Sequence, residues 1–135
     1  MATRSMIAFD NDDEVYAIYC HSDGYLSHNG KLLYEYWSAL EDVEDLIALG
    51  DLSILGEEIG EKQDFDNRTS RKWCLAYGRD RGEKNTAAKT FGSIDEAVSF
   101  YDDCDYFYVF DGREWMWKRH DQNAWNELTL EDVKG

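Results

Sequence analysis

Short apolar runs separated by a polar connection divide the start of the chain into two expected strands. Residues 4–9 are mainly apolar, residues 15–20 are β-branched and aromatic, and residues 10–14 between them are entirely polar. Such runs favour strands, and a polar connection between two of them favours an antiparallel hairpin. Residues 21–30 carry glycines among polar side chains without a regular period, so they are expected to form an irregular loop.

Helical spacing of apolar residues appears in the middle of the chain. Residues 31–37 and residues 40–49 are predicted helices, and Gly50 suits the position just past the end of the second one. Ser93 followed by Glu96 is a capping box, so a third helix is expected to begin there. The apolar side chains that repeat at helical spacing in the second helix are Leu40, Val43, Leu46 and Ile47.

The remaining apolar runs complete the expected sheet. Further strands are predicted at residues 72–77, 88–91, 105–110 and 113–118. The last two flank Asp111-Gly112, a strong signal for a tight hairpin turn. We therefore predict a single domain over residues 1–135 of the α+β class, with an antiparallel sheet of about five strands and two or three helices packed on one face. Aromatic residues on both parities of the last hairpin indicate either that both sheet faces are covered or that one is exposed for a partner.

The composition predicts the class of protein, its cellular location and the state of its cysteines. The 135 residues are 43% hydrophobic and 32% charged, the balance of a globular domain. There is no run of 18 apolar residues and no apolar leader stretch, so a cytoplasmic protein is expected. The three cysteines are widely spaced in apolar surroundings and are predicted to be buried free thiols. No metal and no cofactor is expected, because the spacings typical of such sites are lacking.

The net charge of −15 is unevenly distributed along the chain. Residues 35–66 carry eleven acids and one base, whereas residues 67–89 carry seven bases and two acids. A charge of this size repels nucleic acids and anionic membranes, so direct binding to either is not expected. It suits instead a partner protein with a basic site.

Several short motifs follow one another in a characteristic order. They are Thr-Arg-Ser at residues 3–5, Tyr-Cys-His-Ser-Asp-Gly-Tyr at 19–25, Asn-Gly-Lys-Leu-Leu at 29–33, Leu-Gly-Asp-Leu-Ser at 49–53, Tyr-Gly-Arg-Asp-Arg-Gly-Glu at 77–83 and an aromatic hairpin at 105–117. In this order and spacing they resemble an uncharacterised family of small phage and prophage proteins, and the resemblance covers most of the chain. The family usually has tryptophan where this chain has Ser22, which removes one aromatic side chain from the loop.

The resemblance implies a phage or prophage origin and therefore the cytoplasm of a host bacterial cell. By analogy with small acidic phage proteins, it implies inhibition of a host protein that acts in defence or on nucleic acids. The acidic block, residues 35–66, has two interpretations: a solvated helix face, or an imitation of a phosphate backbone that a basic groove accepts. For the second reading, the expected partner-binding residues are Glu41, Asp42, Glu44, Asp45, Glu57 and Glu58, with Tyr25 and Trp37 as aromatic anchors.

A second hypothesis is a small-ligand protein, either a sequestering protein or an enzyme. Its candidate ligand-binding residues are His21, Asp23, His28, Arg79 and Arg81, which would have to meet in one pocket. In the structural reading of the same loop, Asp23 caps backbone amides and Gly24 supplies a positive φ. In the structural reading of the arginines, they neutralise acids of the chain. A third hypothesis is self-association into a homodimer through exposed aromatic residues. No catalytic residue is assigned, and a binding protein is expected rather than an enzyme.

Overall fold

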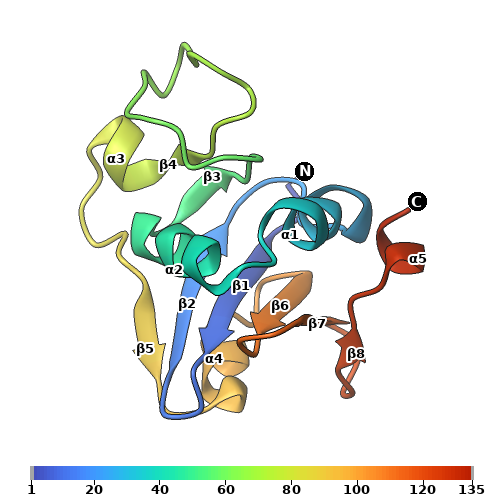
Figure 1. Ribbon diagram of the computed structural model, residues 1–135. Coiled ribbons are helices and arrows are strands. Elements are labelled where there is room, and N and C mark those ends of the chain that lie inside the picture. The colour runs from blue at the N-terminus through green and yellow to red at the C-terminus, as the bar shows by residue number, and fades with distance from the viewer. Residues whose placement is uncertain (1, 135) are drawn as a thin grey trace.

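The computed structural model describes residues 2–134, and its centre is a mixed sheet of eight strands (Figure 1). The strands are β1 (Ser5–Asp10), β2 (Val15–Cys20), β3 (Leu52–Ile54), β4 (Leu75–Ala76), β5 (Lys89–Phe91), β6 (Tyr106–Phe110), β7 (Trp115–Arg119) and β8 (Asn126–Glu127). The helices are the π-helix η1 (Leu26–Gly30) and the α-helices α1 (Lys31–Tyr36), α2 (Leu40–Leu49), α3 (Tyr77–Arg81), α4 (Ile94–Phe100) and α5 (Leu130–Val133). The α+β class expected from the sequence is confirmed.

The strand order corrects the expected antiparallel sheet. The order is β4-β3-β2-β1-β6-β7-β8, and β5 also pairs with β2. The hairpins β1–β2 and β6–β7 are antiparallel as predicted, but β1 pairs with β6 and β2 pairs with β3 in parallel. Parallel partners are joined by long crossover connections rather than by a tight turn. Turn signals in a sequence identify only strands that are neighbours along the chain. They therefore predict antiparallel hairpins and do not reveal parallel pairing between strands that are far apart.

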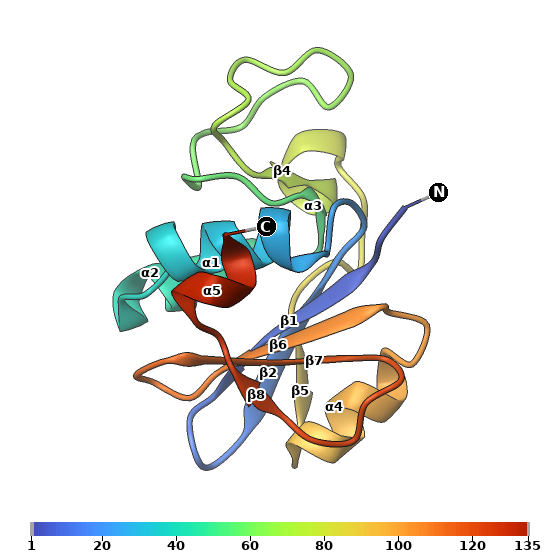
Figure 2. The same cartoon turned by 90° about the vertical axis from the view of Figure 1, so that its right-hand side faces the viewer.

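Both faces of the sheet are covered, which corrects the expectation that the helices share one face. Along β1, Ile7 contributes to one hydrophobic cluster while Met6 and Ala8 contribute to the other. The first cluster includes buried residues of α1, α2 and α5, and the second includes Ala97 of α4. Figure 2 shows these three helices on one side of the sheet and α4 on the other. The aromatic side chains of β6 and β7 therefore fill two cores.

The helix signals of the sequence are mostly confirmed. In α2, the predicted apolar side chains Val43, Leu46 and Ile47 are buried, and Gly50 follows the helix with a φ of 88°. Ser93 caps α4 by accepting a hydrogen bond of 3.2 Å from the backbone N–H of Glu96. Three short helices lie where no helix was predicted: η1 within the loop expected at residues 21–30, α3 directly after β4, and α5 near the end of the chain. Each has fewer than six residues, too few to show a helical period.

The three cysteines are free and buried, as predicted. Burial raises the pKa of the Cys20 thiol to about 12 and that of Cys74 to about 11, which disfavours the reactive thiolate. Among the helices formed by residues 2–134, none has the length and apolar character needed to cross a membrane.

Candidate functional site

The four acids of α2 all lie on the surface. Glu41, Asp42, Glu44 and Asp45 are exposed because the apolar residues at helical spacing turn toward the sheet and leave the intervening positions outside. These four carboxylates span about 6 Å of helix axis at 1.5 Å per residue. Duplex DNA carries one charge per roughly 1.7 Å of its axis, so the local charge density is comparable.

These acids have no basic partner within the part of the chain that the structure describes. The ion pairs found among residues 2–134 are Arg4–Asp103, Arg79–Asp80, Arg81–Glu83 and Arg119–Asp121. The two pairs that involve the basic segment 67–89 use acids of that same segment. No ion pair among the described residues therefore joins residues 35–66 to residues 67–89, although the charge of Lys89 opposes the rise that burial causes in the pKa of Asp51. The exposed carboxylates of α2 face solvent.

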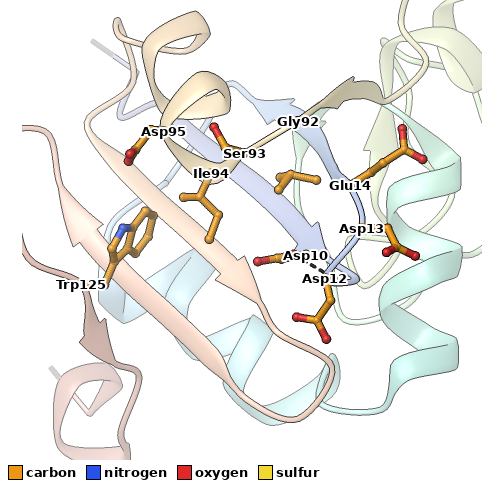
Figure 3. Close-up of a pocket in the computed structure, with 10 residues that line it drawn as sticks. Asp10, Asp12, Asp13, Glu14, Gly92, Ser93, Ile94, Asp95 and Trp125 are labelled. Atoms are coloured by element: carbon orange, nitrogen blue, oxygen red, sulfur yellow. Dashed lines mark hydrogen bonds between the residues drawn. The ribbon is translucent and has the colours of Figure 1, made fainter.

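A second group of acids surrounds a hollow of about 400 Å³ at the β1–β2 turn. Figure 3 shows Ile94 and Trp125 beside this hollow, with Asp10 and Asp12 from the turn and Asp95 from α4. The lining residues are Asp10, Asp12, Asp13, Glu14, Val15, Gly92, Ser93, Ile94, Asp95 and Trp125, none of them basic. The polar pattern of residues 10–14 predicts only a connection between strands, although four of these five residues are acidic.

The acids of α2 and of the turn belong to one stretch of surface. Glu44 of α2 lines a second hollow, of about 480 Å³, together with Asn11 and Tyr16 of the β1–β2 hairpin. The hairpin thus has the α2 acids on one side and Asp95 of α4 on the other. We call this region the acidic surface, defined by Asp10, Asp12, Asp13, Glu14, Glu41, Asp42, Glu44, Asp45 and Asp95.

The other two predicted acids lie elsewhere. Glu57 and Glu58 follow β3, in the connection to β4 that Figure 1 shows at the opposite end of the molecule from the β1–β2 turn. Glu57 is half-buried, and its hydrogen bond with the hydroxyl of Tyr36 raises the pKa of that tyrosine. The structure therefore does not bring these two carboxylates to the acidic surface.

The two predicted aromatic anchors have different positions. Tyr25 is 38% exposed, and its hydroxyl donates a hydrogen bond of 3.2 Å to Asp23. Trp37 is only 3% exposed, which corrects its expected role as a surface anchor. Its indole N–H donates to the carbonyl of Gly56 at 3.0 Å, and its own carbonyl accepts from Trp115 at 2.8 Å. A buried tryptophan whose indole N–H and backbone carbonyl are both hydrogen-bonded within the protein is a core residue.

The predicted ligand-binding loop is held together by its own hydrogen bonds. His21 shares a hydrogen bond of 2.8 Å with the hydroxyl of Tyr19, and His28 shares one of 2.9 Å with Asn29. Asp23 has a φ of 55° and accepts only from Tyr25 among the side chains. The histidines and Asp23 thus have separate partners. Within residues 2–134, no group of three or more His, Cys, Asp or Glu side chains is arranged to hold a metal ion.

Gly24 is required in this loop for close packing rather than for a positive φ, which Asp23 supplies instead. A Cβ on Gly24 would lie 2.9 Å from the Cβ of Ser5 and 2.9 Å from the carbonyl oxygen of Thr3. The buried amide of Asn29 donates to the Ser5 hydroxyl at 3.1 Å. These contacts fix the loop against the start of β1.

Substitution of Tyr108 by phenylalanine tests the loop's attachment to the core. The buried hydroxyl of Tyr108 donates a hydrogen bond of 2.6 Å to the carbonyl of Gly24. Its loss leaves a buried carbonyl without that partner, so we expect the free energy of unfolding to fall by about 1–3 kcal/mol. Urea denaturation measures this. Tyr34→Phe, at an exposed tyrosine, is the control and should change stability by less than about 0.5 kcal/mol.

The two arginines proposed for ligand binding are engaged by the fold in different ways. Arg79 donates to the carbonyls of Ile59 at 2.7 Å and Cys74 at 2.8 Å and pairs with Asp80 at 2.9 Å. Arg81 lies over the rings of Phe65 and Tyr77, 4.8 and 5.2 Å from their centroids. Arg79 is thus a structural residue that connects the long β3–β4 segment to α3.

His21 does line a hollow, of about 420 Å³, but with other partners. The remaining lining residues are Ala2, Arg4, Asp103 and Asp105. Asp23, His28, Arg79 and Arg81 are not part of this hollow, so the ligand pocket expected from the sequence does not assemble there. A comparison with models of protein families, with curated proteins and with solved structures found no match for this chain, and the resemblance to small phage proteins stays a prediction.

Proposed function

We propose that this chain is a phage- or prophage-type binding protein that inhibits a host protein by occupying its basic site with the acidic surface. The observation that carries the proposal is the set of four exposed carboxylates on α2, which have no ion-pair partner among residues 2–134. Isolated acids on a helix are ordinarily only solvated. Here the neighbouring β1–β2 turn adds further acids beside α2, and Asp95 of α4 lies across the turn on the other face of the sheet. No base lines the hollow between the turn and α4.

The physical effect of such a surface is on encounter with the partner. Charges of one sign on adjacent elements add to a common field, which steers an oppositely charged protein and raises its association rate. At physiological ionic strength, dissolved salt screens this electrostatic field over a distance of about 8 Å. The charge density of α2 is comparable with that of duplex DNA, which supports a nucleic-acid-binding protein of the host as the target.

Neutralising α2 is expected to slow association with the partner about 10- to 1,000-fold. The test variant is E41Q/D42N/E44Q/D45N. The wild-type protein is immobilised, a nuclease-treated bacterial lysate is passed over it, and retained proteins are identified and purified. Association and dissociation rates are then measured for wild type and variant at low and high salt. Duplex DNA is added as a competitor, since a target that normally binds DNA should release one ligand as it binds the other.

The control variant carries the same change of charge away from the acidic surface: E61Q/D66N/D102N/E131Q, at four exposed positions. It should retain most of the wild-type association rate. If both variants weaken binding equally, only overall charge matters and the acidic surface is not the site. A wild-type protein that captures no basic protein, or one whose binding is insensitive to salt, would contradict the proposal for that host.

A further inference from the structure

An apolar hollow lies within the acidic surface. Its volume is about 480 Å³, and it lies between α2, the β1–β2 hairpin and the chain entering β5. Apolar side chains make up most of its lining: Phe9, Tyr16, Ile47, Ala48, Ala87 and Ala88. A surface that only imitated phosphates would need no such feature, because recognition of phosphates is electrostatic.

The hollow exists because large and small side chains meet there. Phe9 and Tyr16 lie opposite each other in the β1–β2 register, on the sheet face that α2 also covers. The other sides of the hollow are lined by alanines, whose methyl side chains are too small to fill it: Ala48, Ala87 and Ala88. The aromatic rings are therefore only half-buried. Ligand sites are typically of this kind, concave and largely apolar with a few polar groups at defined positions.

The polar groups around the hollow are acidic or neutral. Glu44 lies on its α2 side and Asn11 on its hairpin side. The hydroxyl of Tyr16 donates a hydrogen bond of 3.2 Å to Glu14, which holds another carboxylate beside the apolar lining. No lysine or arginine lines the hollow. An occupant that buries an apolar side chain here would thus meet carboxylates from two directions.

We infer that this hollow receives a large apolar side chain from a basic amphipathic segment of the partner protein, whose lysine or arginine side chains pair with Glu44 and Glu14. The inference rests on the proposed function and deepens it by naming the chemistry of the bound segment. Helices with one apolar and one basic face bind other proteins in this way, through apolar anchors at helical spacing. Charge alone then sets the encounter, while the apolar contact slows dissociation.

Two synthetic helical peptides of equal length and charge test the inference. Both carry lysines on one face. The other face carries leucines in the first peptide and glutamines, which have a similar helix propensity, in the second. Burying a leucine side chain favours binding by about tenfold or more. We expect the wild-type protein to bind the leucine peptide at least about tenfold more tightly, as measured by calorimetry, and the methyl NMR signals of Ala87 and Ala88 to shift.

Two alanine variants locate the effect. Ala48→Trp places a large ring at an exposed position of the hollow, whereas Ala124→Trp does so at an exposed position outside it. Ala48→Trp should abolish the preference for the leucine peptide and keep the affinity for the glutamine peptide, and Ala124→Trp should bind both like wild type. Circular dichroism and thermal unfolding establish that each variant is folded before its binding is compared.

The outcomes separate this inference from the proposed function. Equal affinity of the wild-type protein for both peptides would overturn the apolar contact and leave the charge-based function standing. A preference for leucine that survives in Ala48→Trp would place the apolar contact elsewhere and also overturn the inference. Failure of both peptides to bind at low salt would count against the acidic surface itself, and so against both.

Discussion

Replacing Asp80 by alanine is expected to lower the free energy of unfolding by about 3–5 kcal/mol, because it leaves a partly buried arginine without its partner. The buried carboxylate of Asp80 accepts hydrogen bonds from the backbone N–H groups of Ala76 at 2.8 Å and Gln63 at 3.0 Å. It also pairs with Arg79 at 2.9 Å. Alanine removes every one of these acceptors, and the segment between β3 and β4 loses the hydrogen bond from Gln63 to α3, while the bond from Arg79 to Ile59 remains.

The effect should depend on pH. Burial alone would raise the pKa of Asp80, but the hydrogen bonds from Arg79 and from the backbone outweigh burial and hold the pKa below its usual value. A depressed pKa contributes stability that is fully present above the pKa of the unfolded state, about 3.9. That contribution is lost as the pH falls below this value and through the folded pKa. The difference between wild type and Asp80→Ala should therefore shrink below about pH 4.

Urea denaturation at several pH values measures this prediction. Asp102→Ala, at an exposed aspartate, is the control and should change stability by less than about 0.5 kcal/mol. Asp80→Asn retains one oxygen acceptor but loses the charge, so an intermediate loss is expected. A wild-type-like Asp80→Ala at neutral pH would show that the network of Arg79 and Asp80 contributes little to stability. Arg79 would then return as a candidate for ligand binding.

Replacing Trp37 by alanine is expected to cost about 3–5 kcal/mol of stability, the range for truncation of a large buried aromatic side chain. The indole ring lies in the main core, and its N–H donates to Gly56 at 3.0 Å. The substitution creates a cavity and leaves the Gly56 carbonyl without this donor. Tyr36→Ala provides the control. The Tyr36 side chain, next to Trp37 in the sequence, is 44% exposed, so its removal should lower the free energy of unfolding much less.

This prediction distinguishes the two roles considered for Trp37. Thermal unfolding and partner binding are measured on the same samples, at a temperature where Trp37→Ala is still folded. If Trp37 is a core residue, the folded variant binds the captured partner with nearly wild-type affinity although it melts at a lower temperature. A folded variant of wild-type stability that no longer binds would instead restore Trp37 as an interface residue.

Local features of this protein were determined by the sequence alone. The polar residues 10–14 and the Asp111-Gly112 pair located both hairpins, and Ser93 with Glu96 located the start of α4. The helical spacing in α2 identified which side chains are buried, and hence that Glu41 to Asp45 apart from Val43 face solvent. These features follow from neighbouring residues, because turn chemistry, capping and amphipathic periodicity act over a few positions.

Only the tertiary structure decided how distant segments meet. The parallel pairing of β1 with β6, the covering of both sheet faces and the burial of Trp37 depend on contacts between residues far apart in the chain. The same contacts engage Arg79 in the fold and place the β1–β2 turn between the acids of α2 and Asp95 of α4, which together form the acidic surface. An exposed tyrosine and a buried tryptophan look alike as local patterns. What separates them is the packing of the whole chain, which local spacing does not encode.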